Sequence, residues 1–308
     1  MNNKQKNIIK LIFGISLLFF VFYKIGLKEI YKTILKINLF FVIPFIIIFY
    51  ILFFILGTIN LKILLNPIKK VSFKKLLKYY ALSWSFGLFI PAKIGEFSLI
   101  FLLKKEKIPI GKTTAISVID KTITLITFII FSAIGFLIFF NKVDSLKFTL
   151  ILLIILSVAI FSVLSNRTRN IIKKLIGKYH IYFKGFSKTL FSYLKKNKKV
   201  LLINFILTLV KWGLIDAGLV FIYFLAFGEI INPIYIILIT AITLIVGLIP
   251  ITINGIGVKT PTAVFLYSQL GIISSIVASV YLIDLVIKYL IASFILAFLF
   301  DKRSLKFK

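Results

Sequence analysis

The sequence predicts an all-α polytopic membrane protein, with about six full spans and two re-entrant hairpins. The chain has 308 residues, of which 60% are hydrophobic, and its mean hydropathy is +1.09. Soluble domains have an apolar share nearer roughly 45–50%. Long apolar runs recur from end to end, and lysines cluster between them. The bilayer is therefore expected to surround most of the chain.

Eight apolar segments define the expected elements. They cover residues 8–23, 39–61, 79–103, 113–140, 148–164, 200–227, 233–271 and 272–300. The first segment follows a basic start, as a signal peptide would. No small-residue cleavage site follows it, so we expect a retained anchor.

The charge and residue usage limit the function classes. A net charge of +30 in a soluble protein would suggest nucleic acid. Here the lysines flank apolar segments, which indicates the positive-inside pattern and attraction to anionic lipid headgroups, and no nucleic-acid partner is expected. The absence of cysteine excludes thiolate metal sites and disulfides. The single histidine, His180, cannot build a histidine-rich metal site, so neither metal nor cofactor is expected.

Lysine distribution also predicts orientation. The strongly basic segments are the N-terminus, 62–78, 104–112, 165–199 and 302–308. We place them, with both termini, on the cytoplasmic side of the cell membrane. The loops at 24–36, 142–147 and 228–232 then lie outside, although the first of them carries four lysines.

The expected organisation is one integral membrane domain over residues 1–308. Its first half covers 1–164, a basic cytoplasmic insert covers 165–199, and its second half covers 200–308. Apolar residues recur at helical spacing in the insert and in 73–80. Both stretches are therefore predicted to form amphipathic helices on the membrane surface.

Segment 79–103 is predicted to be re-entrant, because both of its flanks are assigned to the cytoplasm. Residues 79–90 would enter, 91–96 would turn and 97–103 would return, and each arm is shorter than the roughly 20 residues of a span. Pro91 and Gly95 supply the break, since proline lacks a donor and glycine permits the turn.

The second half repeats this pattern. The sequence Val-Gly-Leu-Ile-Pro250 parallels Phe-Gly-Leu-Phe-Ile-Pro91, and a break containing Gly255, Gly257 and Lys259 follows. The stretch that ends at Asp120 is echoed by the one that ends at Asp284. Segment 233–271 would enter from the opposite side, which predicts an inverted repeat of the kind found in transporters.

Ionisable residues inside the apolar segments are candidates for function. Each would cost roughly 2.5–3.5 kcal/mol at the bilayer centre, so they must pair, line a wet cavity or lie near the interface. They are Lys93, Glu96, Asp120, Lys121, Lys211, Asp216, Lys259, Asp284 and Lys288.

Their spacing predicts some of the pairs. Asp284 and Lys288 are four apart with the acid first, which favours a helical ion pair. Adjacent Asp120 and Lys121 should point about 100° apart, so each is expected to need another partner. Lys211 and Asp216 are likewise expected on different faces of their helix.

Lys93 and Glu96 flank the first break. They are expected to line a polar cavity, because non-helical backbone at membrane depth must meet protein or water. The alternative is a shallow hairpin whose lysine reaches the headgroups.

Three motifs carry a resemblance to a known family. Pro-Ala-Lys-Ile-Gly-Glu96, Asp-Lys121 and Pro-Ile-Thr-Ile-Asn-Gly-Ile-Gly-Val-Lys259 resemble the lysylphosphatidylglycerol synthase transmembrane-region family, also called flippase-like membrane proteins. The resemblance covers nearly the whole chain. The family typically has Pro-x-Arg-x-Gly-Glu, Glu-Arg and Gly-Gly-x-Gly-x-Arg-Glu. Here lysines replace the arginines and Thr260 replaces the final glutamate, so the bidentate arginine geometry is lost.

The resemblance implies movement of a lipid across the membrane. We therefore expect transfer of an anionic phospholipid or lipid-linked intermediate between leaflets. Lys93 and Lys259 would contact the headgroup phosphate, and the carboxylate of Glu96 would balance the positive charge at the site. The remaining charged residues, Asp120, Lys121, Asp284 and Lys288, would pair charges or handle a coupling proton.

Two other functions remain open. One is a membrane component of a glycosyl- or aminoacyl-transfer system with a lipid-linked donor, in which Glu96 could act as a base. The other is an accessory subunit that holds a soluble or membrane transferase partner through residues 165–199. The sequence has no nucleotide-binding loop and no nucleophile beside a base, which disfavours an enzyme. In the family the region is fused to a soluble aminoacyltransferase domain. We expect no such domain here, so lipid aminoacylation by this chain alone is not expected.

Overall fold

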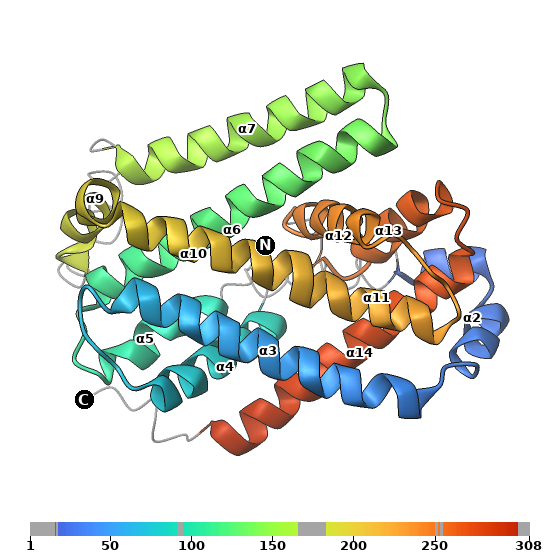
Figure 1. Cartoon of the computed structure of the whole chain (residues 1–308), viewed down its shortest axis with the longest axis horizontal. Helices are drawn as coiled ribbons and strands as arrows, with labels where there is room; N and C mark the ends of the chain where they lie inside the picture. Colours follow the sequence, from blue (N-terminus) through green and yellow to red (C-terminus); the bar gives the residue numbers. More distant parts are fainter. Residues whose placement is uncertain are drawn as a thin grey trace, which may run out of the picture.

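The computed structural model describes residues 16, 18–90, 95–165, 183–249, 252 and 255–300. All regular secondary structure in this part of the chain is helical (Figure 1). Five helices are long and apolar enough to cross a membrane: Phe40–Leu65, Ile110–Phe139, Lys142–Ser162, Lys198–Ala226 and Ser274–Leu299. The predicted class, an all-α multi-pass membrane protein, is confirmed. The sixth predicted span, residues 8–23, lies largely outside the described residues.

Most of the described elements follow the predicted segments, but α2 is a helix within residues 24–36, which were predicted to be a loop. They are α2 (Leu27–Ile34), α3 (Leu39–Leu65), α4 (Phe73–Phe89), α5 (Ser98–Lys104), α6 (Ile110–Phe139), α7 (Lys142–Leu164), α9 (Phe186–Lys196), α10 (Lys198–Val210), the π-helix η3 (Lys211–Asp216), α11 (Ala217–Ala226), α12 (Pro233–Val246), α13 (Lys259–Ser268) and α14 (Ser274–Leu299). Helix α7 begins six residues before the predicted segment at 148. The side chain of Asn141 caps it by accepting a hydrogen bond from the backbone N–H of Asp144.

The first hairpin is formed by α4 and α5, which pack against each other. At its open end the Tyr79 hydroxyl donates to Glu106 Oε1 at 2.9 Å, and Lys75 Nζ lies 3.1 Å from Glu106 Oε2. The chain therefore returns to the end from which α4 starts, as predicted. Residues 73–80 do not form a separate surface helix. They are the first turns of α4, and Leu76 among them is fully buried.

The second hairpin is formed by α12 and α13, which also pack together. Gly255 has a φ of 78° and lies so close to Gly247 that a Cβ on Gly255 would come within 2.7 Å of the Gly247 Cα. A Cβ on Gly95 would likewise meet the Phe86 carbonyl. Each hairpin tip thus depends on a glycine that lets two backbone segments touch.

The two halves pack in a reciprocal way. Helix α3 and the continuous helix α10–η3–α11 lie side by side and run in opposite directions (Figure 1). Helix α4 of the first hairpin packs on α14 of the second half, and α12 of the second hairpin packs on α6 of the first. This exchange of hairpins between oppositely directed halves is the arrangement expected of an inverted repeat.

Several basic segments lie at one end of the molecule. The Tyr193 hydroxyl of α9 hydrogen-bonds the Leu64 carbonyl at the end of α3. Gly111 at the start of α6 lies against the backbone of Lys184. The predicted surface position of the insert is only partly right. Helix α9 packs on α6 and buries Leu190 and Tyr193, while residues 166–182 lie outside the described part.

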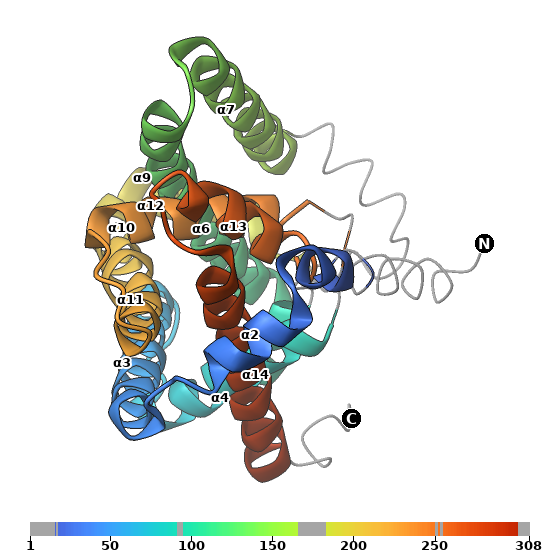
Figure 2. The ribbon, with the colours of Figure 1, turned by 90° about the vertical axis from the view of Figure 1, so that its right-hand side faces the viewer.

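Helix α7 lies at the periphery. It packs on α6 and otherwise stands away from the body of the molecule (Figure 2). Val158 and Phe161 are among its many exposed apolar side chains. A helix this apolar and this exposed is suited to contact with lipid tails rather than water.

Candidate functional site

Three neighbouring cavities lie where the two hairpins meet the long helices. The first-hairpin cavity has a volume of about 70 Å³, the second-hairpin cavity about 90 Å³ and the aromatic cavity about 70 Å³. Leu88, near the tip of the first hairpin, lines all three. Each is large enough to hold several water molecules.

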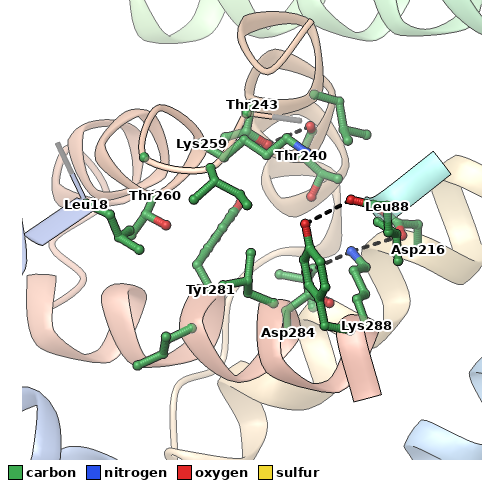
Figure 3. A pocket seen from close by; sticks show the side chains of 18 of the residues that line it. Leu18, Leu88, Asp216, Thr240, Thr243, Lys259, Thr260, Tyr281, Asp284 and Lys288 are labelled. Carbon is green, nitrogen blue, oxygen red and sulfur yellow. Dashed lines mark hydrogen bonds and ion pairs between the residues drawn. The ribbon is translucent and has the colours of Figure 1, made fainter. Parts of the chain in front are cut away.

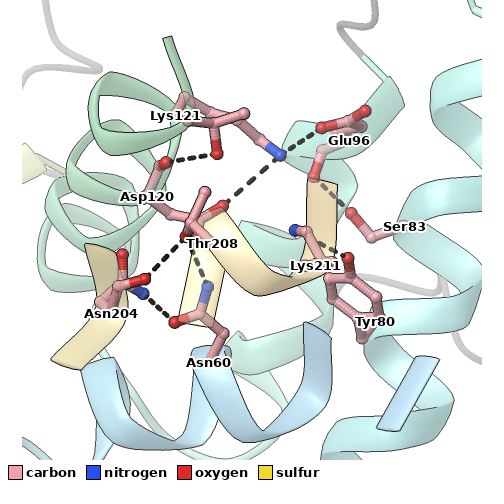
Figure 4. Close-up of polar contacts among 10 residues, drawn as sticks. Asn60, Tyr80, Ser83, Glu96, Asp120, Lys121, Asn204, Thr208 and Lys211 are labelled. Atoms are coloured by element: carbon pink, nitrogen blue, oxygen red, sulfur yellow. Dashed lines mark hydrogen bonds and ion pairs between the residues drawn. The ribbon is translucent and has the colours of Figure 1, made fainter. Parts of the chain in front are cut away.

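The first-hairpin cavity contains a lysine that bridges two carboxylates (Figure 4). Lys121 Nζ forms an ion pair with Glu96, so it has the separate partner that was predicted. It also lies 3.5 Å from Asp120 Oδ2, a contact between the adjacent residues that was not predicted. The Ser83 hydroxyl donates to the backbone carbonyl of Glu96, which fixes the return of the hairpin. This triad is partly open, since the Lys121 side chain is 44% exposed.

Lys211 enters the same cavity from η3. It is only 5% exposed, and its Nζ lies 5.1 Å from the centre of the Trp212 ring and 5.7 Å from that of Phe53. Its one polar contact is a weak hydrogen bond to the Tyr80 hydroxyl at 3.5 Å. Among the described residues, no carboxylate lies within 4 Å of this ammonium group.

The second-hairpin cavity has a matching triad (Figure 3). Lys288 Nζ lies 2.7 Å from Asp284 Oδ2 and 3.8 Å from Asp216 Oδ1. The predicted Asp284–Lys288 pair is confirmed, and Asp216 joins it from η3. Lys259, at the start of α13, lines the same cavity. The Tyr289 hydroxyl donates to the Leu88 carbonyl at 3.0 Å, which ties α14 to the tip of the first hairpin.

The π-helix explains why one helix serves both cavities. Lys211 and Asp216 are both buried, at 5% and 9% exposure, and they line different cavities: Lys211 the first-hairpin cavity, and Asp216 the second-hairpin and aromatic cavities. In an α-helix, residues five apart lie about 140° apart around the axis. A π-helix bonds residue i to i+5 and has a wider turn, and in this one both side chains are directed into the protein. Such turns are frequent at functional sites.

The aromatic cavity joins the other two. Its rings include Phe53, Trp84 and Trp212, shared with the first-hairpin cavity. Its charged residues are Asp216, Lys259 and Lys288, shared with the second. The space between the two triads is therefore lined partly by aromatic faces.

The predicted site residues thus fall into two groups. Glu96, Asp120 and Lys121 come together in the first half, and Lys259, Asp284 and Lys288 in the second. Gly95, Gly255 and Gly257 lie at the breaks. Lys93, Pro91 and Pro250, like His180, lie outside the described residues. No group of three or more His, Cys, Asp or Glu that could hold a metal ion occurs in the described part of the chain.

A buried polar network was not predicted. Asn204 donates to Asn60, and Asn60 Nδ2 donates to Thr208 Oγ1 at 2.8 Å (Figure 4). It ties α3 to α10, in the manner of polar contacts between transmembrane helices. The available signal was an asparagine in an apolar run of each helix, Asn60 and Asn204.

Comparison with known proteins agrees with this architecture. No curated protein and no solved structure gives a significant match to the chain. The model of the family described as the lysylphosphatidylglycerol synthase TM region matches residues 7–295. This match spans both hairpins and both triads. The chain therefore belongs to the family of the lysylphosphatidylglycerol synthase transmembrane region.

Proposed function

We propose that this membrane protein moves an anionic phospholipid, or a lipid-linked intermediate, between the two leaflets. One observation carries the proposal. Two hairpins enter from opposite ends, and each brings charged side chains to a cavity that the aromatic cavity joins to the other. Transporters with inverted repeats place their sites at such paired breaks. Family membership places the protein in lipid-related processes.

The charges suit a headgroup that passes through. Lys259 would bind the headgroup phosphate, and Lys93 is proposed for the same role at the other tip. Lys121 and Lys288 are each held between two carboxylates. Such pairing offsets part of the cost of burying charge, so the path can stay polar without destabilising the helices.

The cavities are small for a headgroup as they stand. Pockets for drug-sized ligands are roughly 300–1,000 Å³. Passage would therefore require the hairpin tips to move apart. The glycine contacts at Gly95 and Gly255 are the points where the proposed movement would begin.

We further propose that the basic end faces the cytoplasm of the cell membrane, with both termini on that side. The clustering of lysine-rich segments at one end supports this orientation. Anionic headgroups would bind there, and a soluble or membrane transferase is a proposed partner for the same surface.

The alternative, a component of a glycosyl- or aminoacyl-transfer system, is less well supported. It requires Glu96 to act as a base. The carboxylate of Glu96 is instead engaged by Lys121, and its backbone carbonyl by Ser83. Translocation therefore fits the site better.

The test is lipid translocation in reconstituted vesicles, followed by chemical quenching of a headgroup-labelled phosphatidylglycerol. Lys259→Ala and Lys93→Ala should each slow translocation at least about tenfold, since a charged hydrogen bond is lost. Lys259→Arg should retain activity, because arginine also binds phosphate. Exposed Lys142→Gln at the start of α7, away from the basic end, controls for the change in net charge. Wild-type rates for both alanine variants would refute the proposal.

A further inference from the structure

Lys211 is a buried cation whose surroundings do not account for its charge. Three aromatic rings and the weak Tyr80 bond are its contacts, and no described carboxylate lies within 4 Å. Burying an ammonium group without a counter-ion is costly. Glu96 and Asp120 line the same cavity, but both carboxylates pair with Lys121, which lies between them.

Ser117 supplies a second unused group in the same cavity. It is 6% exposed, and its hydroxyl has no hydrogen-bond partner in the described part of the chain. It lies one turn before Lys121 on α6 and lines the cavity together with Lys211. A buried hydroxyl without a partner is an exception that calls for a ligand or water.

We propose that Lys211 and Ser117 form a phosphate subsite in the first-hairpin cavity. An ammonium group and a hydroxyl both donate to oxyanions, and charge-assisted bonds of this kind are the strong ones. The Tyr80 hydroxyl, already beside Lys211, offers a third donor. The rings of Phe53 and Trp212 lie beside Lys211 and lower the local dielectric on that side of the cavity, which strengthens the attraction.

The subsite rests on the proposed function for the source of its phosphate, which we take to be a lipid headgroup. It adds a phosphate contact in the first half, distinct from Lys259 in the second. The headgroup would then exchange between a lysine of η3 and a lysine of α13 across the aromatic cavity.

The chain provides its own probe. Its two tryptophans, Trp84 and Trp212, both line the first-hairpin cavity. Binding there should change tryptophan emission saturably. The detergent-solubilised full chain is titrated with dihexanoyl phosphatidylglycerol and, separately, with inorganic phosphate. Saturation by the lipid alone identifies a headgroup site, and saturation by both identifies a general phosphate site. Either supports the subsite.

The variants test the residues. Lys211→Gln should weaken binding at least about tenfold and Lys211→Arg should restore it. Ser117→Ala should weaken binding several-fold, and this small change keeps the test valid if Lys211→Gln folds poorly. Lys142→Gln, which changes an exposed lysine at the start of α7 and outside the basic end, should bind as the wild type does. Apparent dissociation constants are compared rather than amplitudes, because Lys211 lies beside Trp212.

Two results would overturn the inference. One is an unchanged dissociation constant in both Lys211→Gln and Ser117→Ala. The other is a wild-type protein whose emission neither ligand changes. The translocation assay separates this failure from that of the proposed function. Lipid movement without binding at Lys211 refutes only the subsite, whereas binding without movement refutes only the transport.

Discussion

The two charge clusters of the molecule are built alike but with opposite signs at two positions. In the first half the hairpin contributes an acid, Glu96, and η3 contributes a lysine, Lys211. In the second half the hairpin contributes Lys259 and η3 contributes Asp216. In both, a lysine of the following long helix lies between two carboxylates. What the two clusters share is therefore a lysine between two carboxylates. The sign of the charge that the hairpin or η3 contributes differs between them.

The clusters differ in burial. The Lys288 side chain is 26% exposed, against 44% for Lys121, and the carboxylates around Lys288 are also less exposed. The second triad should therefore matter more for stability, and the first should be more open to water.

The largest expected effect is the loss of Lys288. Lys288→Met leaves Asp216 and Asp284 buried without their cation and should destabilise the fold by about 3–5 kcal/mol. Lys121→Met should cost only about 1–2 kcal/mol, because water reaches its carboxylates. Thermal unfolding in detergent measures both. Equal losses of stability in the two variants would show that the difference in burial between the triads does not affect the free energy of unfolding.

A set of charge-neutral variants controls this comparison. Asp284→Asn combined with Lys288→Met still leaves Asp216 unpaired, because Asp216 is part of the triad. Adding Asp216→Asn removes all three charges and should recover much of the stability. Failure to recover would mean that the side chains act through packing rather than charge.

The second expected effect tests whether the hairpin tips require glycine for packing. Gly255 and Gly271 both have a φ of 78°, but a Cβ on Gly271 would meet nothing within 4 Å. Gly255→Ala should therefore cost about 1–3 kcal/mol more than Gly271→Ala, because only the first overpacks a contact. Gly95→Ala should resemble Gly255→Ala. Equal melting temperatures for Gly255→Ala and Gly271→Ala would contradict the close backbone contact.

The smallest effect concerns an ionic contact at the open end of the first hairpin. Partial burial acts to raise the pKa of Glu106, but hydrogen bonds from Lys75 and Tyr79 outweigh it and hold the pKa below its usual value. Since the unfolded pKa is higher, at about 4.3, the carboxylate stabilises the fold above that pH. This contribution is lost as the pH falls through the folded pKa.

Glu106→Gln should accordingly lower the free energy of unfolding at neutral pH by less than about 1 kcal/mol. Thermal unfolding should show this as a slightly lower melting temperature. The difference from the wild type should vanish in acid. The exposed Glu29 provides the matched control, Glu29→Gln. A difference that persists unchanged at low pH would show that the contact is not ionic.

Much of the fold could be predicted because its determinants are local. Apolar length gave the spans, and proline with glycine gave the breaks. The Asp284–Lys288 pair followed from a spacing of four on one helix. The first hairpin was located because both of its flanks are basic, and the second because its sequence repeats the pattern of the first. Neither inference requires knowledge of packing.

The rest depended on contacts between distant segments. Nothing near Lys121 in the sequence indicates that Glu96 pairs with it, because the pairing depends on how α5 returns along α6. The pairing of Asp216 with Lys288 depends on a non-α turn. Because a π-helix cannot be recognised from these residues alone, the cavities that Lys211 and Asp216 line could not be predicted.

The π-helix can also be regarded as one inserted residue in the α10–α11 span. Residues before and after it are out of phase by about 100° relative to an uninterrupted α-helix. That offset lets η3 present Lys211, at its start, to one cavity and Asp216, at its end, to the other. Removing one position between them would rotate everything downstream by the same angle and carry the acid away from Lys288. The length of this turn is therefore constrained more tightly than the identity of an outward residue such as Leu214, which is exposed.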